Sequence, residues 1–376
     1  MNRASQLSAL ADRDPANPIL LCDLLDELLS AGLVDETVAR ITNAPPALRE
    51  LPGVRFREAR CALLHGDAKA AIDLLKPLLA SMKDVPPGVV HDLAYAQFSQ
   101  GRADEAMQTL AHAHEQGDDA VALALLKARI FHHQRQYDSA LEVLAPIQAG
   151  TRLSEVQGLR ALLLLDMGDT ARASAEAEHA LRADPDQHEA GIVRGTVALW
   201  SQRLQESTAA FERVLANHPE SGRAWLGLGQ DLMLRGDVPA ARALLVRASI
   251  QMPDHIGTWH ALAWCQLLEG DLAGAKHSFD KAFALDRTFG ETHGGFALVH
   301  ALRGERKEAE ESVKRAMRLD PQGRSARYAQ SVLLFDEGRV DEARAITDGI
   351  LARTPGAGAV PADFIFRLRE IVRPRG

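Results

Sequence analysis

The chain has 376 residues, of which 46% are hydrophobic, 25% are charged and only 5% are aromatic. This balance is typical of a soluble folded protein, and no stretch approaches the length of a membrane span. The formal net charge of −8 argues against nucleic acid as the main ligand.

The first 17 residues are predicted to be an N-terminal capping segment. Within them, residues 4–12 should form a short polar helix in which Leu7 and Leu10 are the large apolar side chains. The segment lacks an apolar core of signal-peptide length. We therefore expect no leader here and a cytoplasmic location.

The three cysteines support the same expectation about location. They are Cys22, Cys61 and Cys265, an odd number without close spacing. Such a set is typical of buried thiols in a reducing compartment rather than of disulfides.

From residue 18 to residue 357 the chain repeats with a period of about 34 residues. Each unit has two helix-period patterns joined at a turn, and a glycine suits this turn because it adopts positive φ without a Cβ clash. The turn glycines are Gly32, Gly66, Gly101, Gly168, Gly236, Gly270, Gly304 and Gly338. The two double gaps each contain one degenerate unit, with Arg135 and Gln202 in the glycine position.

A small residue follows every turn position by five residues, which lets two helices approach closely. These residues are Thr37, Ala71, Ala106, Ala140, Ala173, Ser207, Ala241, Ala275, Ala309 and Ala343. The units are predicted at 18–51, 52–86, 87–120, 121–153, 154–187, 188–221, 222–255, 256–289, 290–323 and 324–357. A single helical hairpin cannot bury its apolar faces, so neighbouring hairpins must stack on it.

The unit at 222–255 carries the most complete motif. It contains Trp225, Leu228-Gly229, Ala241, Ala248 and Pro253. This pattern resembles the tetratricopeptide repeat (TPR). The resemblance implies an all-α fold, an α-solenoid in which about ten TPR helical hairpins form a right-handed superhelix with short N- and C-terminal capping helices. It is specific for fold and weak for function, since such repeats serve many tasks.

Residues 358–376 are predicted to form a C-terminal amphipathic capping helix. Residues 356–359 read as a flexible joint. The pattern of 361–372 gives one apolar face, made by Phe364, Ile365, Leu368 and Ile371. The helix either covers the exposed face of the tenth unit or acts as a detachable element that binds a partner.

Motifs that carry catalysis or hold a cofactor are absent from the sequence. It contains no phosphate-binding loop, no nucleophile elbow and no zinc-protease pair of histidines. Pairs such as His112 and His114, or His132 and His133, diverge on a helix and lack cysteine partners at ligand spacing. We therefore expect no enzyme activity, no metal and no cofactor.

The inner face of the array is the candidate binding surface. In families that this chain resembles, the first helix of each hairpin lines that face. The candidate peptide-binding residues there are Phe56, Arg60, His91, Tyr95, Phe98, Arg129, His132, Trp200, Gln230, His260, Trp264 and Tyr328. Aromatic side chains on such a wall provide contact area at low entropic cost, although several could instead pack against the next repeat.

Two functions are consistent with these residues. The first is a non-catalytic scaffold that binds a protein or peptide client in the concave groove. The alternative is a targeting or regulatory subunit that acts in trans with an enzyme such as a glycosyltransferase, sulfotransferase or hydroxylase. The sequence indicates neither the client nor the oligomeric state.

Overall fold

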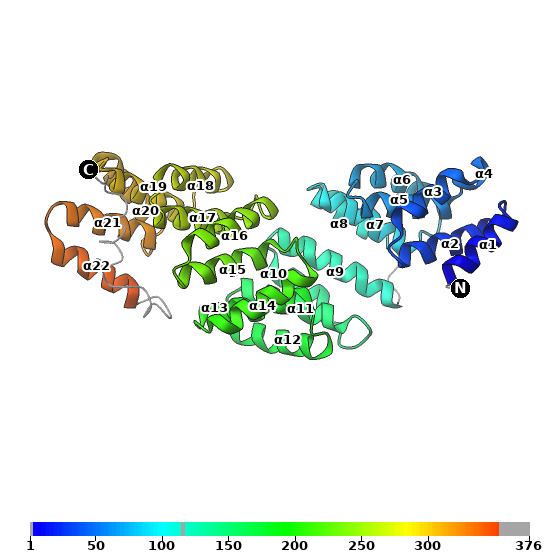
Figure 1. Ribbon diagram of the computed structural model, residues 1–376, viewed down its shortest axis with the longest axis horizontal. Coiled ribbons are helices and arrows are strands. Elements are labelled where there is room, and N and C mark those ends of the chain that lie inside the picture. The colour runs from blue at the N-terminus through cyan, green and yellow to red at the C-terminus, as the bar shows by residue number, and fades with distance from the viewer. Residues whose placement is uncertain (1–2, 114–116, 353–376) are drawn as a thin grey trace. The chain divides into compact units, whose positions relative to one another are not determined.

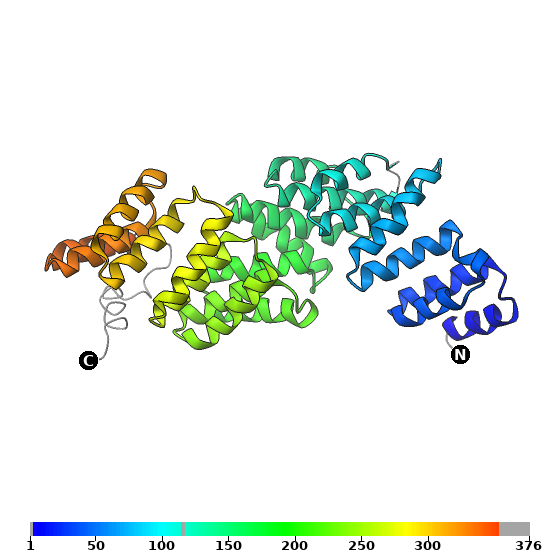
Figure 2. The same cartoon turned by 90° about the horizontal axis from the view of Figure 1, so that it is seen from above.

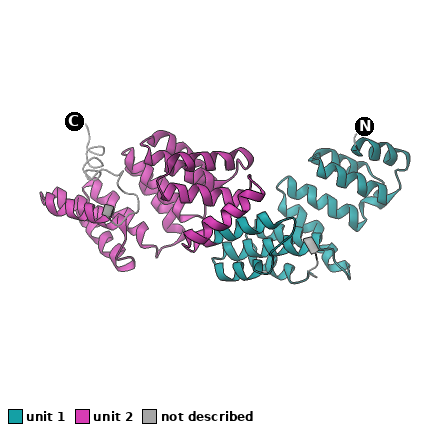
Figure 3. Ribbon diagram, turned by 90° about the horizontal axis from the view of Figure 1, so that it is seen from below, with its two compact units in different colours: residues 1–163 teal, residues 164–376 magenta. Residues whose placement is uncertain are grey.

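The protein is all helical throughout the part of the chain that its computed structural model describes, residues 3–113 and 117–352 (Figure 1). Twenty-two helices and no strand occur in these residues, which confirms the expected fold class. The chain divides into two compact units, residues 1–163 and 164–376 (Figure 3), and each is described separately.

In unit 1 a short helix, α1 (Arg3–Arg13), packs on the first of the paired helices. The following helices are α2 (Pro18–Ser30), α3 (Val34–Asn43), α4 (Pro46–Arg49), α5 (Pro52–Leu64), α6 (Ala68–Ser81), α7 (Pro87–Ser99), α8 (Ala103–Leu110), α9 (Gly117–His133) and α10 (Tyr137–Leu144). Helix α11 (Leu153–Asp166) ends at the start of unit 2. The short helix α4 was not expected, and α9 begins four residues before the predicted unit boundary at residue 121.

Unit 2 continues the alternation of first and second helices. Its helices are α12 (Thr170–Ala183), α13 (His188–Trp200), α14 (Leu204–Asn217), α15 (Gly222–Leu234), α16 (Val238–Gln251), α17 (Ile256–Leu268), α18 (Leu272–Leu285), α19 (Gly290–Arg303), α20 (Arg306–Leu319), α21 (Arg324–Asp336) and α22 (Val340–Ala352). From α13 onward, each first helix contacts its own second helix, and that second helix contacts the next first helix; Figure 2 shows these helices stacked in succession. The described residues therefore contain ten helix pairs, in agreement with the predicted array of about ten hairpins.

The turns explain why every pair closes at the same place. All eight turn glycines have positive φ, between 72° and 85°. Arg135 and Gln202 adopt the same left-handed conformation, with φ of 59° and 55°. The prediction that these two residues occupy degenerate glycine positions is therefore confirmed.

An aspartate directly after the turn glycine begins several of the second helices. Asp67, Asp169, Asp237 and Asp271 each accept a hydrogen bond from the backbone N–H three residues later, at 2.8–3.3 Å. This satisfies one of the N–H groups that a helix start leaves unpaired. The Gly-Asp pair thus fixes both the end of one helix and the start of the next.

The core of each unit lies between the helix pairs. The small residues at the fifth position after each turn are all fully buried. Where a bulky ring enters this layer, glycine makes room for it. A Cβ atom added to Gly227 would lie 2.1 Å from the Phe211 ring, and one added to Gly295 would lie 2.4 Å from the Phe279 ring.

Two further expectations concern membrane spans and the C-terminal helix. None of the helices within residues 3–113 and 117–352 is long and apolar enough to cross a membrane. The amphipathic helix expected at 361–372 lies outside the described residues.

Candidate functional site

All twelve candidate residues lie on first helices of the pairs. Seven belong to unit 1 and five to unit 2. The unit 1 residues lie on α5, α7 and α9, and the unit 2 residues lie on α13, α15, α17 and α21. They therefore form two separate groups, whose contacts and exposure differ from residue to residue.

In unit 1 the side chains of α5 and α7 meet around Asp92. The Arg60 guanidinium lies 5.8 Å from the centre of the Phe56 ring, and its Nε lies 3.5 Å from Asp92 Oδ2. His91 Nδ1 lies 3.0 Å from Asp92 Oδ1. The Asp92 carboxylate is largely buried, so it partly neutralises Arg60 and orients it across the ring.

Asp92 was not among the candidates, because it is neither aromatic nor cationic, the two kinds of side chain most frequent in the predicted inner face. Its position one residue after His91, on a first helix, was the available signal. The consequence for binding is direct, since part of the positive charge that Arg60 could offer a client is already balanced.

The remaining unit 1 candidates divide into packed and open side chains. Phe98 is partly buried and meets the His133 ring edge-on, with centroids 5.5 Å apart. His132 lies 5.8 Å from the Tyr137 ring. Tyr95 instead leaves 48% of its surface exposed in the middle of α7. Tyr95 is therefore the aromatic side chain of this group that a partner can reach most directly.

In unit 2, His260 is held between neighbouring hairpins. Its ring lies 5.3 Å from that of Phe279 and 5.4 Å from that of Phe289, and its Nε2 lies 2.8 Å from Thr292 Oγ1. Burial lowers the pKa of His260 to about 4, against a weaker opposing effect of the Glu291 charge. His260 is thus neutral at neutral pH and offers no positive charge to a client.

Trp264 and Tyr328 meet edge-to-face, with ring centroids 5.6 Å apart. Tyr328 is buried, and this burial raises the pKa of its hydroxyl. Trp200 is 51% exposed at the last position of α13, and Gln230 is partly buried on α15. Trp200 is therefore the open aromatic side chain among the unit 2 candidates.

An ion pair that the sequence did not indicate links first helices two hairpins apart. Arg223 on α15 donates to both carboxylate oxygens of Asp166, at 2.9 and 2.7 Å, across 57 residues of sequence. Both side chains are mostly buried, and such forked pairs fix geometry as well as charge. No spacing within one repeat could have indicated it.

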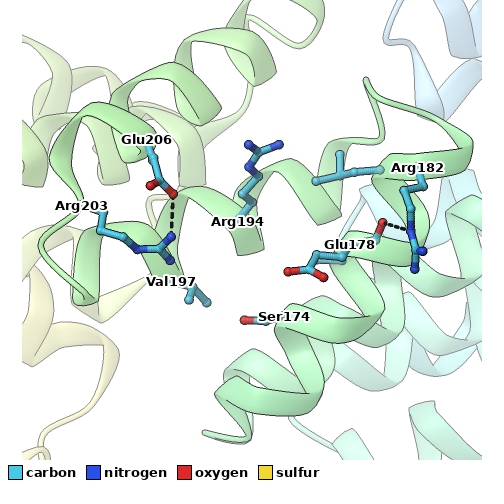
Figure 4. Close-up of a pocket in the computed structure, with 9 residues that line it drawn as sticks. Ser174, Glu178, Arg182, Arg194, Val197, Arg203 and Glu206 are labelled. Atoms are coloured by element: carbon cyan, nitrogen blue, oxygen red, sulfur yellow. Dashed lines mark hydrogen bonds and ion pairs between the residues drawn. The ribbon is translucent and has the colours of Figure 1, made fainter.

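A pocket of about 510 Å³ lies between α12 and α13 (Figure 4). Helix α12 contributes Glu178 and Leu181, and α13 contributes Arg194 and Val197. Arg203 and Glu206, at the start of α14, form an ion pair at its edge with N and O 2.6 Å apart. None of these residues was a candidate, because the predicted surface consisted mainly of aromatic side chains on first helices.

The histidine pairs of the sequence that could be considered as metal ligands are His112 with His114 and His132 with His133. Those of these histidines that the structure describes contact aromatic rings or the backbone. Nowhere in residues 3–113 or 117–352 do three or more His, Cys, Asp or Glu side chains gather at metal-binding distances. His112 Nδ1 lies 2.9 Å from the backbone oxygen of Gln108, whereas His114 lies outside the described residues. The rings of His132 and His133 meet Tyr137 and Phe98, respectively.

Comparison with known families identifies repeats along most of the chain. Three models, each described as a tetratricopeptide repeat, match residues 62–130 and 97–163, residues 154–187, and residues 192–254 and 296–358. Together these matches cover well over half of the chain.

Among curated proteins, the chain is 33% identical over 110 residues to cellulose synthase operon protein C of Escherichia coli K12. This match covers 28% of the chain and 9% of that protein, so the chain spans only a small part of its relative. A putative protein of the same name from Escherichia coli O157:H7 is 31% identical over 107 residues.

Solved structures with similar helical folds include the Cut9 and Hcn1 complex. It is 14% identical, with a TM-score of 0.46, and the match covers 93% of this chain and 81% of that one. Another is TTC0263 of Thermus thermophilus, which is 19% identical with a TM-score of 0.41 over 48% of this chain and 99% of that one.

Proposed function

This chain belongs to the tetratricopeptide repeat family, and from that premise we propose that it is a non-catalytic scaffold that binds a protein or peptide client along its first helices. Tetratricopeptide repeat proteins in general bind protein partners. Within each unit, the repeats also place first helices next to one another, and rows of this kind form the binding surfaces of stacked-repeat proteins.

The observation that carries this proposal is the exposure of aromatic side chains on first helices. Tyr95 and Trp200 leave 48% and 51% of their surfaces exposed, although aromatic residues make up only 5% of the chain. Large, rigid aromatic side chains supply much of the binding energy at protein interfaces while losing little conformational entropy. In unit 2, α17 carries a further aromatic side chain, Trp264, whose ring meets that of Tyr328.

The test begins with affinity capture of the client from source cells, followed by calorimetric titration of variants. Tyr95→Ala, Trp200→Ala and Trp264→Ala should each weaken client binding about thirtyfold or more if the client uses that position, because a buried aromatic anchor contributes at least about 2 kcal/mol. Ile250→Ala is the matched control, since Ile250 is 70% exposed on the second helix α16.

Helical content measured by circular dichroism should be unchanged in all four variants. If the three aromatic variants bind the client with wild-type affinity, the client uses another surface and the first-helix site is excluded.

The alternative function, a targeting or regulatory subunit acting in trans with an enzyme, is favoured by one observation. The curated relative at 33% identity carries a name that links it to a cellulose synthase operon, and a synthase is an enzyme. Under this alternative, the captured client would be an enzyme whose rate or substrate range changes when the scaffold is added. A client without catalytic activity would support the simple scaffold instead.

A further inference from the structure

We propose that the pocket between α12 and α13 is a second binding site, for a peptide segment in which an apolar residue separates an acidic from a basic side chain. Its volume of about 510 Å³ lies within the range of roughly 300–1,000 Å³ that is typical of ligand pockets. None of its lining residues is among the first-helix candidates, so the proposal does not depend on the client-binding surface.

The charges of the pocket fall into two classes. Arg203 pairs with Glu206, and Arg182 donates to the backbone oxygen of Glu178 and to His179 Nδ1, at 3.3 and 2.9 Å. In contrast, the Arg194 guanidinium and the Glu178 carboxylate form no hydrogen bond or ion pair with any residue that the structure describes. One positive and one negative group are therefore available to a ligand.

The two available charges come from opposite walls. Figure 4 shows Glu178 on α12 and Arg194 on α13, the two helices that line the pocket. Charge-assisted hydrogen bonds to carboxylates and ammonium groups are stronger than neutral ones. A ligand with a single sign of charge would satisfy one of the groups and lie close to a like charge on the other.

The lining of the pocket also includes apolar side chains. These are Ala177 and Leu181 of α12 and Val197 of α13, and Ala177 is almost completely buried. An apolar side chain placed there would bury its surface while the flanking charges reach Arg194 and Glu178. This arrangement favours a peptide with the order acidic, apolar, basic over a free ion or a purely apolar group.

The probe is the capped tripeptide acetyl-Asp-Leu-Lys-amide, titrated with the full chain and followed by ligand-observed NMR. Three control peptides have the sequences Asp-Leu-Asp, Lys-Leu-Lys and Asp-Ser-Lys with the same end groups. Each lacks one of the three contacts, to Glu178, to Arg194 or to the apolar lining. The mixed-charge peptide should therefore bind at least about tenfold more tightly than any of them. Equal binding of all four peptides would overturn the proposal.

Variants identify the site. Arg194→Gln and Glu178→Gln should each weaken binding of the mixed-charge peptide about tenfold or more, whereas Arg172→Gln, an exposed arginine of α12 outside the pocket, should not change it.

Two results would contradict the proposal. One is wild-type affinity in both Arg194→Gln and Glu178→Gln. The other is no binding of the mixed-charge peptide to the wild-type chain. Either result leaves the first-helix surface unaffected, because the Tyr95 and Trp264 variants test that surface separately.

Discussion

At the scale of single residues, two turns depart from the pattern of the others. Arg135 and Gln202 have the positive φ that glycine has in the eight other turns. A residue with a Cβ atom in this left-handed conformation is strained by about 1–2 kcal/mol. Both side chains are exposed, so the strain is a property of the backbone and not of a buried contact.

We expect Arg135→Gly and Gln202→Gly each to raise the free energy of unfolding by about 0.5–1 kcal/mol. Relief of the strained turn should exceed the extra entropy that glycine gives the unfolded chain. Urea midpoints measure the effect, and Gly236→Ala, the reverse change at an equivalent turn with φ of 83°, should lower the midpoint. A lower midpoint in both glycine variants would show that these turns are not strained.

His260 makes stability depend on pH. Its pKa is about 4 in the folded chain and about 6.5 in an unfolded one, so the unfolded state binds more protons between these values. Stability is therefore fully present above pH 6.5 and is lost as the pH falls toward 4. The cause is burial among Phe279, Phe289 and Thr292, which disfavours the charged ring.

When the pH falls from 7 to 5, protonation of this histidine in the unfolded chain should lower the free energy of unfolding by about 2 kcal/mol. Urea unfolding at both pH values, in the wild type and in His260→Phe, isolates its contribution from that of the carboxylates. The wild type should lose more stability than the variant. An identical loss in both proteins would mean that His260 titrates normally.

At the scale of helices, stacking depends on contacts in which a large buried side chain of one helix packs against a glycine of a neighbouring helix. The Phe211 ring of α14 is fully buried and lies against both Gly195 of α13 and Gly227 of α15. Phe279 of α18 has the same relation to Gly295 of α19, two repeats later. The ring of a second helix thus determines how closely the following first helix can approach.

Gly227→Ala should destabilise the protein by about 1–3 kcal/mol, because its Cβ would lie 2.1 Å from a ring atom of Phe211. Gly349→Ala on α22 is the matched control. A Cβ atom there has nothing within 4 Å, so alanine should be neutral or stabilising. Urea midpoints of both variants measure the difference.

The steric explanation also predicts how substitutions of Gly227 and Phe211 combine. Adding Phe211→Leu to Gly227→Ala should cost less than the sum of the two single changes, since the smaller side chain leaves room for the methyl group. Strict additivity would mean that the destabilisation arises elsewhere.

At the scale of the whole molecule, each hairpin depends mainly on its neighbours. In unit 2, α15 contacts α13, α14, α16 and α17. Stability in such stacks is approximately the sum of repeat terms and nearest-neighbour terms. A local defect should therefore loosen the adjacent repeats first.

We expect Gly227→Ala to accelerate amide hydrogen exchange in α13 to α17, while α5 to α8 of unit 1 retain their wild-type protection. Exchange followed by mass spectrometry resolves these helices. Uniformly faster exchange over both units would instead indicate a single cooperative structure.

The sequence by itself determined the ten helix pairs, their turns and the small residues between them. These features are local: a turn needs positive φ at one residue, and a close helix contact needs a small residue at a fixed distance from it. Even the two turns without glycine, at Arg135 and Gln202, followed from spacing alone.

Only the tertiary structure decided which side chains remain open to a partner. Periodicity places His260, Tyr328, Tyr95 and Trp200 alike on first helices. Packing against neighbouring hairpins buries Tyr328, which meets Trp264, and most of His260, which meets Phe289 and Thr292. The Arg223–Asp166 pair and the pocket between α12 and α13 join different repeats. Such contacts depend on the distance between stacked helices and on side-chain rotamers, which no pattern within a single repeat specifies.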